Sequence, residues 1–303
     1  MNDKYHSGKR RKKREKLIRS GFFIIALASM LTLGLIVAFL FMEGLPIFGK
    51  VSIKDFIFGE YWYPTSDPPD FGIFPLIIAS LAVTLTSSVL SIPLGILTAL
   101  CLAELASQRI REIVKPVVEL LAALPSVVIG FFGMVIVAPF LQKILDIPTG
   151  LNLFNAALML AFMSVPTICS ISEDAIFSVP RELKEASLAL GATHWETIWR
   201  VIIPASISGI STAVILGMSR AIGETMVALM VAGGAAMIPE SIFDPVRPLP
   251  ASIAAEMAEA PFRGEHYYAL FATGIVLFLF TMAFNMVAEY ISNRYRQVGA
   301  ATL

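Results

Sequence analysis

Six long apolar runs, separated by polar loops, constrain the fold of this chain more than any other feature of its sequence. A helix needs about 20 predominantly apolar residues to cross a bilayer. The runs occupy about residues 20–42, 73–103, 116–140, 153–171, 207–235 and 267–291, and the third is broken in the middle by Leu124-Pro125-Ser126. Of all residues, 56% are hydrophobic and only 15% are charged, whereas soluble domains carry about a quarter charged residues. The sequence therefore predicts an all-α membrane protein with six transmembrane helices.

The basic residues are distributed unevenly and predict an orientation. Nine of the 23 Lys and Arg residues fall within the first twenty positions, directly before the first apolar run. With the N-terminus inside, the inside segments hold seventeen basic residues and the outside segments five. Because cytoplasmic flanks carry an excess of Lys and Arg, we expect a flexible basic cytoplasmic tail over 1–19, a transmembrane domain over 20–303 and both termini in the cytoplasm. A nucleic-acid-binding arm is not expected, because an apolar run follows the tail at once.

A polar segment over 178–204 interrupts the apolar sequence between the fourth and fifth runs. Gly191 is a natural helix end, because glycine accepts left-handed backbone angles. Thr193 with Glu196 three residues later forms a capping box that predicts the start of a second helix. Through Pro204 this segment leads directly into the fifth run. We therefore predict a cytoplasmic helical hairpin on which a partner docks.

No catalytic or metal-binding pattern stands out in the sequence. Residues 44–51 nearly match a nucleotide-binding loop, but they lack the Ser or Thr that holds Mg²⁺. The three histidines lack metal-ligand spacing, and both cysteines lie in apolar runs, as small buried hydrophobic residues do. We therefore predict no enzyme activity, no metal and no cofactor, so that any ATP hydrolysis belongs to a partner.

Arg220 and Glu224 are the only ionisable residues near the middle of a predicted span. Each costs about 2.5–3.5 kcal/mol at a helix centre on insertion scales. Four residues apart on one helix, they share a face and can pair. We expect them, with the adjacent Thr225, to line a polar path, and an Arg suits an oxyanion. A structural ion pair inside the bundle remains the alternative, and an unpaired Glu224 argues against a simple anion pore.

Residues 185–204 resemble the EAA signature of the permease subunits of ABC importers. That signature reads Glu-Ala-Ala, three residues, Gly, nine residues, then Ile-x-Leu-Pro. Here the elements with this spacing are Glu185-Ala186-Ser187, Gly191 and Val201-Ile202-Ile203-Pro204. The resemblance implies that the segment is a coupling helix seated in a cleft of a cytoplasmic ATPase. The residues it assigns to this contact are Glu185, Ala186, Ser187, Gly191 and Pro204.

Further stretches resemble the phosphate-specific permeases of this family, namely residues 124–130, 190–193 and 220–226. Residues 231–234, the long first external loop and Ile253-Ala254-Ala255-Glu256 are similar to those of the PstC-type subunit. The resemblance implies the type I importer (MetI-like) fold in the inner membrane. It also implies a second similar permease, two copies of a cytoplasmic ATPase and an external phosphate-binding protein.

The implied function is ATP-driven phosphate import by alternating access, with the anion passing near Arg220 while Glu224 holds or gates it. Molybdate and sulfate permeases share the coupling signature, so another oxyanion is an alternative substrate. A gradient-driven transporter or channel using Arg220 and Glu224, and a membrane anchor that only recruits an ATPase, are alternatives from other classes.

Overall fold

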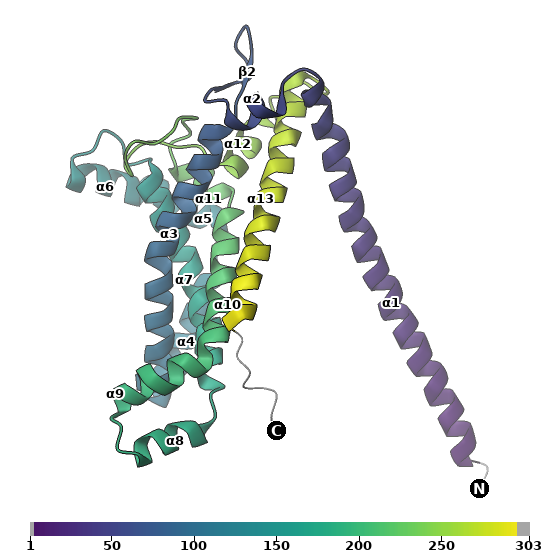
Figure 1. Cartoon of the computed structure of the whole chain (residues 1–303), viewed down its shortest axis with the longest axis vertical. Coiled ribbons are helices and arrows are strands. Elements are labelled where there is room, and N and C mark those ends of the chain that lie inside the picture. The colour runs from purple at the N-terminus through teal and green to yellow at the C-terminus, as the bar shows by residue number, and fades with distance from the viewer. Residues whose placement is uncertain (1–2, 296–303) are drawn as a thin grey trace.

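The computed structural model describes residues 3–295 and is helical apart from one two-stranded hairpin (Figure 1). The long helices are α1 (Asp3–Gly44), α3 (Phe74–Leu100), α7 (Leu153–Phe177), α10 (Ile203–Ile222) and α13 (Glu265–Tyr295). The α-helices of 15 residues or fewer are α2 (Ile53–Phe58), α4 (Gln108–Ala122), α5 (Ser126–Phe132), α6 (Ala138–Leu145), α8 (Arg181–Ala189), α9 (His194–Thr197), α11 (Met226–Val231) and α12 (Leu249–Glu256).

One 3-10 turn, η1 (Leu45–Gly49), and three π-helical segments interrupt or extend these helices. The π segments are η2 (Cys101–Leu105), η3 (Gly133–Val137) and η4 (Ile198–Ile202). Strands β1 (Trp62–Tyr63) and β2 (Asp70–Phe71) pair antiparallel, with Trp62 opposite Phe71.

Within the described residues, six helical segments are long and apolar enough to cross a membrane. They are Ile18–Gly49, Phe74–Leu105, Ser126–Leu145, Leu153–Phe177, His194–Ile222 and Glu265–Tyr290. This confirms the all-α, six-span prediction.

Helix α7 is the centre of the bundle, with α3 and α10 packed against it and α13 packed against α10. Gly95 of α3 and Gly217 of α10 both face Ile168 of α7, where a β-carbon would lie 2.7 and 2.5 Å from its side-chain atoms. Small residues at these two positions let the three helices approach closely, as is usual between transmembrane helices.

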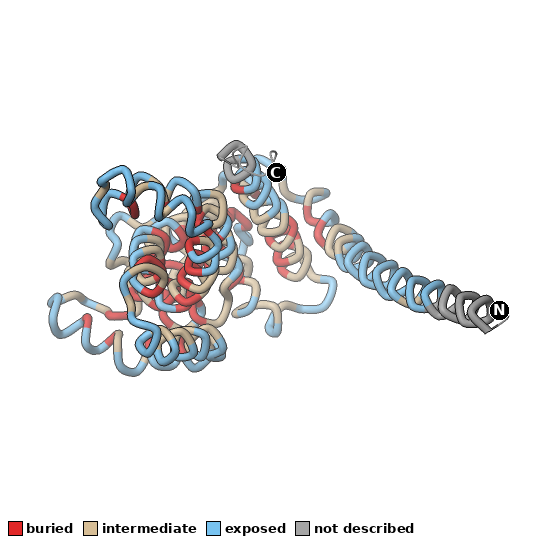
Figure 2. Tube along the Cα trace, turned by 90° about the horizontal axis from the view of Figure 1, so that it is seen from below, coloured by how far each residue is buried: buried red, intermediate tan, exposed pale blue. Residues whose placement is uncertain are grey.

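Figure 1 shows α1 sloping away from the other helices, which it meets only where it adjoins η1 and α13. Figure 2 shows buried positions concentrated inside the bundle and almost none along α1. We call the end of the bundle that carries β1 and β2 the hairpin end, and the end that carries α8 and α9 the loop end.

The N-terminal tail differs from the sequence prediction. The tail predicted to be flexible over 1–19 is helical from Asp3, and residues 1 and 2 lie outside the described part.

The fifth span also differs from the prediction of 207–235. Its helix begins at His194 and runs through η4 and Pro204 to Ile222. Pro204 does not interrupt it, because it lies in the first turn of α10, directly after a π segment. The helix then ends, and α11 starts only at Met226. Arg220 and Glu224 therefore flank a helix end.

The third run shows a second break. Helix α4 ends at Ala122 and α5 begins at Ser126, so the chain leaves the helix at the Leu124-Pro125 step, as the sequence predicts.

Candidate functional site

The polar segment 178–204 forms the two short helices α8 and α9 at the loop end. Gly191 takes a φ of +87°, the left-handed conformation expected at this helix end. The Glu196 N–H donates to Thr193 Oγ1 at 3.2 Å, and the Thr193 N–H donates to Glu196 Oε2 at 2.9 Å. The predicted capping box is therefore confirmed, and it satisfies two backbone N–H groups at the start of α9.

The predicted partner-contact residues lie on one accessible loop. Glu185, Ala186, Gly191 and Pro204 are exposed, and a β-carbon at Gly191 would meet nothing within 4 Å. Ser187 is half-buried, and its hydroxyl lies 2.9 Å from that of Thr197, which is buried. The serine that departs from the EAA pattern thus joins α8 to α9.

Large apolar side chains are exposed on the same loop. Leu190 is 90% exposed and Trp195 60% exposed. Trp195 and Trp199 contact each other edge to face, with ring centroids 5.8 Å apart. A patch of exposed Leu and Trp side chains is typical of a surface that binds another protein.

One ion pair attaches the loop to the bundle. Lys184 of α8 pairs with Glu104 of η2, whose side chain is only 7% exposed. The sequence analysis missed Glu104, which lies one residue beyond the predicted second run.

A second buried carboxylate, Glu173 of α7, holds α4. Arg111 Nη2 lies 2.7 Å from Glu173 Oε1, and Lys115 Nζ lies 3.0 Å from Oε2. The side chain of Glu173 is 1% exposed. Glu173 lies two residues after the predicted fourth run, and its charge is opposite to that of the basic loop at 109–115. This charge complementarity could have indicated the contact from the sequence.

Arg220 lies where the two helix breaks meet. Its Nη1 donates to Thr167 Oγ1 of α7 at 3.3 Å, and its Nη2 donates to the carbonyl of Ala122 at 3.4 Å. That carbonyl belongs to the last residue of α4, where a cation is favoured by the helix dipole. Arg220 therefore connects the end of α4 to α7 and α10.

Glu224 does not pair with Arg220, so the structural ion pair that the sequence left as an alternative is not formed. Its Oε1 accepts from the backbone N–H groups of Met226 at 3.2 Å and Val227 at 3.4 Å, which begin α11. No ion pair joins Arg220 and Glu224 in the described part of the chain. The pairing fails because the helix ends at Ile222, so the two residues no longer share one helical face.

Thr225 lies in the same break, and its hydroxyl donates to the Gly223 carbonyl at 3.4 Å. Beyond the break, α11 packs against α5, where a β-carbon at Gly130 would lie 3.3 Å from Val227 Cα. The structure thus brings Arg220, Glu224 and Thr225 together between two interrupted helices. Interrupted helices at membrane depth are tolerated where they are buried in protein or line a cavity.

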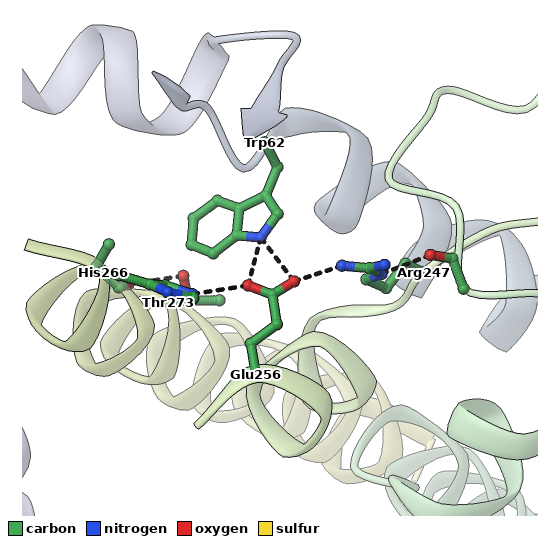
Figure 3. A network of polar contacts seen from close by, with 7 residues as sticks. Trp62, Arg247, Glu256, His266 and Thr273 are labelled. Atoms are coloured by element: carbon green, nitrogen blue, oxygen red, sulfur yellow. Dashed lines mark hydrogen bonds and ion pairs between the residues drawn. The ribbon is translucent and has the colours of Figure 1, made fainter. Parts of the chain in front are cut away.

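Another polar cluster lies at the hairpin end, where several side chains surround Glu256 (Figure 3). The Trp62 indole N–H lies within hydrogen-bond distance of both carboxylate oxygens, at 3.1 and 3.0 Å. Arg247 pairs with Oε1, and His266 Nε2 lies 2.8 Å from Oε2. The sequence analysis used Glu256 only as part of a family stretch and did not anticipate these partners, which come from three other segments.

Six spans with α7 at the centre of the bundle, two interrupted helices and an accessible loop that carries α8 and α9 define the fold and candidate sites of an importer-type permease. Residues 91–297 match the family described as "Binding-protein-dependent transport system inner membrane component", and the chain belongs to this family.

Two relatives illustrate the range of similarity. The probable ABC transporter permease protein YqgH of Bacillus subtilis (strain 168) is 38% identical over 261 residues, covering 86% of this chain and 84% of the relative. The phosphate transport system permease protein PstC of Mesorhizobium japonicum is 34% identical over 259 residues, covering 79% of this chain and 78% of the relative.

Two solved structures are similar in fold. A chain of a bacterial ABC transporter involved in the import of the acidic polysaccharide alginate matches with a TM-score of 0.61 at 18% identity, over 89% of this chain and 96% of that one. A chain of the MetNI methionine ABC transporter, in an inward-facing conformation, matches with a TM-score of 0.58 at 19% identity, over 72% and 94%.

These similarities confirm the type I importer fold and the permease family. The chain is a multi-pass inner membrane permease of a binding-protein-dependent ABC importer. It is not an enzyme, since ATP hydrolysis belongs to the ATPase partner of such a permease.

Proposed function

We propose that this chain is the PstC-type permease subunit of an ATP-driven phosphate importer. The observation that carries the proposal is the position of Arg220, whose guanidinium contacts a hydroxyl and a carbonyl and has no carboxylate partner in the described part of the chain. Its charge is therefore available to an oxyanion, whose geometry a guanidinium matches with two donors. Relatives named as phosphate permeases, 34% and 32% identical, support phosphate as that oxyanion.

The role of Glu224 supports the same substrate class. Glu224 lies four residues after Arg220, but its carboxylate caps the first turn of α11. An anion near Arg220 therefore meets a carboxylate whose charge is partly offset by two backbone N–H groups and the positive end of a helix. This lowers the repulsion that the sequence alone suggests.

The proposed mechanism is alternating access. The loop end is cytoplasmic in the proposed topology, and the residues Glu185, Ala186, Ser187, Gly191 and Pro204 contact an ATPase dimer. The helix from His194 to Ile222 then carries the movement of the ATPase to the break at Gly223. Over 29 residues, at about 1.5 Å per residue, this element is about 43 Å long.

The remaining partners in the proposal are a second, similar permease and an external phosphate-binding protein. A solved alginate ABC transporter was crystallised with its pentasaccharide-bound periplasmic protein, and its permease chain matches with a TM-score of 0.58. Both termini of this chain are cytoplasmic in the proposed topology, in agreement with the excess of basic residues at the loop end.

The test is uptake of labelled phosphate in cells that lack this chain and then regain it, with sulfate and molybdate as competitors. We expect uptake to depend on the chain and on Arg220, because one charge-assisted hydrogen bond contributes about 1.5–3 kcal/mol. Arg220→Gln should then lower uptake about ten-fold or more. The matched control is Arg109→Gln, since Arg109 is exposed.

Other outcomes would assign other functions. Strong competition by sulfate or molybdate would make the chain a permease for that oxyanion. Transport driven by a gradient, with no ATPase in the purified complex, would favour a secondary transporter or channel. Uptake that survives Arg220→Gln unchanged would favour an anchor that only recruits the ATPase.

A further inference from the structure

Glu256 joins three segments that are far apart in the sequence. Trp62 comes from the first loop after α1, Arg247 from the loop before α12, and His266 from the first turn of α13. Figure 3 shows the three side chains converging on one carboxylate. Two of the features that are similar to the PstC-type subunit, the long first loop and the stretch ending at Glu256, thus meet at one residue.

Burial makes these contacts difficult to replace with water. The side chain of Glu256 is 15% exposed and that of His266 10% exposed, while Trp62 is 2% exposed. Trp62 also packs in one apolar core with Leu249 of α12 and Leu270 of α13. We call residues 45–73, which cover this end of the bundle, the cap. Removing the carboxylate charge here leaves the half-buried Arg247 guanidinium without its anionic partner.

A chain of hydrogen bonds continues from Glu256 to α11. Arg247 Nε donates to the Gly234 carbonyl at 2.6 Å, and the Gly234 N–H donates to the Val246 carbonyl at 3.1 Å. The Val246 N–H in turn donates to the Ala232 carbonyl at 2.8 Å. Ala232 directly follows α11, and α11 is only six residues long. The other end of α11, at Met226, adjoins the helix break beside Arg220.

We propose that Glu256 is a positioning residue that fixes α11, and through it the break at Arg220, relative to the cap. The function given to the break depends on the transport path proposed above. The geometric part, that Glu256 holds α11, stands without knowledge of the substrate. Glu256 acts through Arg247 and α11 and does not touch the anion.

The experiment measures whether α11 stays packed. In the full complex, with Cys101→Ser and Cys169→Ala as background, Ala228→Cys places a thiol on α11 at a position that is 2% exposed. The rate of labelling by a membrane-permeant maleimide then reports how often α11 moves. We expect Glu256→Gln, which keeps the side-chain shape, to raise this rate about ten-fold, because local opening follows the loss of a charge-assisted contact.

The matched control is Glu259→Gln, the same chemical change three residues later on an exposed side chain. It should leave labelling and import unchanged. Trp62→Phe keeps an aromatic six-membered ring and removes the five-membered ring of the indole with its N–H donor, so it should raise labelling in the same direction. It decides the outcome if Glu256→Gln does not assemble.

Equal labelling rates in the parent, Glu256→Gln and Trp62→Phe would overturn the proposal, as would an increase of the same size in Glu259→Gln. The readout also separates the two proposals. Increased labelling together with import of an anion other than phosphate would overturn the substrate assignment and leave the role of Glu256 standing.

Discussion

The ion pair between Lys184 and Glu104 predicts an asymmetric response to mutation where the 178–204 segment joins the bundle. The Glu104 side chain is 7% exposed and that of Lys184 23% exposed. Lys184→Met leaves a buried carboxylate without its partner, which costs about 3–5 kcal/mol. Glu104→Gln leaves a lysine on an exposed helix, which reaches water and loses about 1 kcal/mol. The double variant should cost about as much as Glu104→Gln alone, so the magnitude of the coupling energy is about 3–5 kcal/mol.

The assay is amide hydrogen exchange over residues 181–189 in the assembled complex, because loss of this pair releases α8 locally and does not unfold the bundle. The exposed pair Lys50–Glu265, at 2.5 Å with side chains 61% and 42% exposed, is the matched control, and its exchange is measured in the first turns of α13. A surface pair of this kind should show a coupling energy of about 0–1 kcal/mol. If the Lys184–Glu104 cycle gives a value as small as the control, the pair does not hold the loop and the reasoning from burial is refuted.

Three further predictions concern helices α8, α9 and α10. Ser187→Ala restores the residue of the EAA pattern but leaves the buried Thr197 hydroxyl without its partner, so α8 should open more easily by about 1 kcal/mol, measured by amide exchange. Glu196→Ala removes the carboxylate that accepts from the Thr193 N–H at the start of α9, so α9 should open more easily in amide exchange. Gly217→Ala places a β-carbon 2.5 Å from Ile168 and should destabilise the bundle by about 1–3 kcal/mol in thermal unfolding, and adding Ile168→Ala should cost less than the two single changes summed.

The features predicted correctly from the sequence are those that local chemistry decides. Thr193 and Glu196 lie three residues apart and satisfy each other's backbone groups, so no distant partner is needed. Gly191 accepts a left-handed conformation for the same local reason. Pro125 breaks the third run because proline restricts the residue before it and removes an N–H donor.

The features that were missed depend on partners distant in sequence or on where a helix ends. Glu104 and Glu173 are buried carboxylates and Glu256 is a half-buried one, and the cations that pair with them come from other helices or loops. No spacing rule connects such residues, since their contacts exist only after the helices have packed. The fifth span was placed too late because Pro204 suggests a boundary, whereas the π segment before it lets the helix continue.

The break after Ile222 gives Glu224 a structural role that mutation can separate from its charge. Glu224→Gln keeps an oxygen acceptor for the N–H groups of Met226 and Val227 and removes only the charge. Glu224→Ala removes both, and loss of a helix cap costs about 0.5–2 kcal/mol. If capping is the role, the Gln variant should import phosphate within about two-fold of the parent, and the Ala variant should import less, because a shift of 1.4 kcal/mol is about ten-fold. An equal loss in both variants would refute capping and assign the charge of Glu224 a direct part in anion passage.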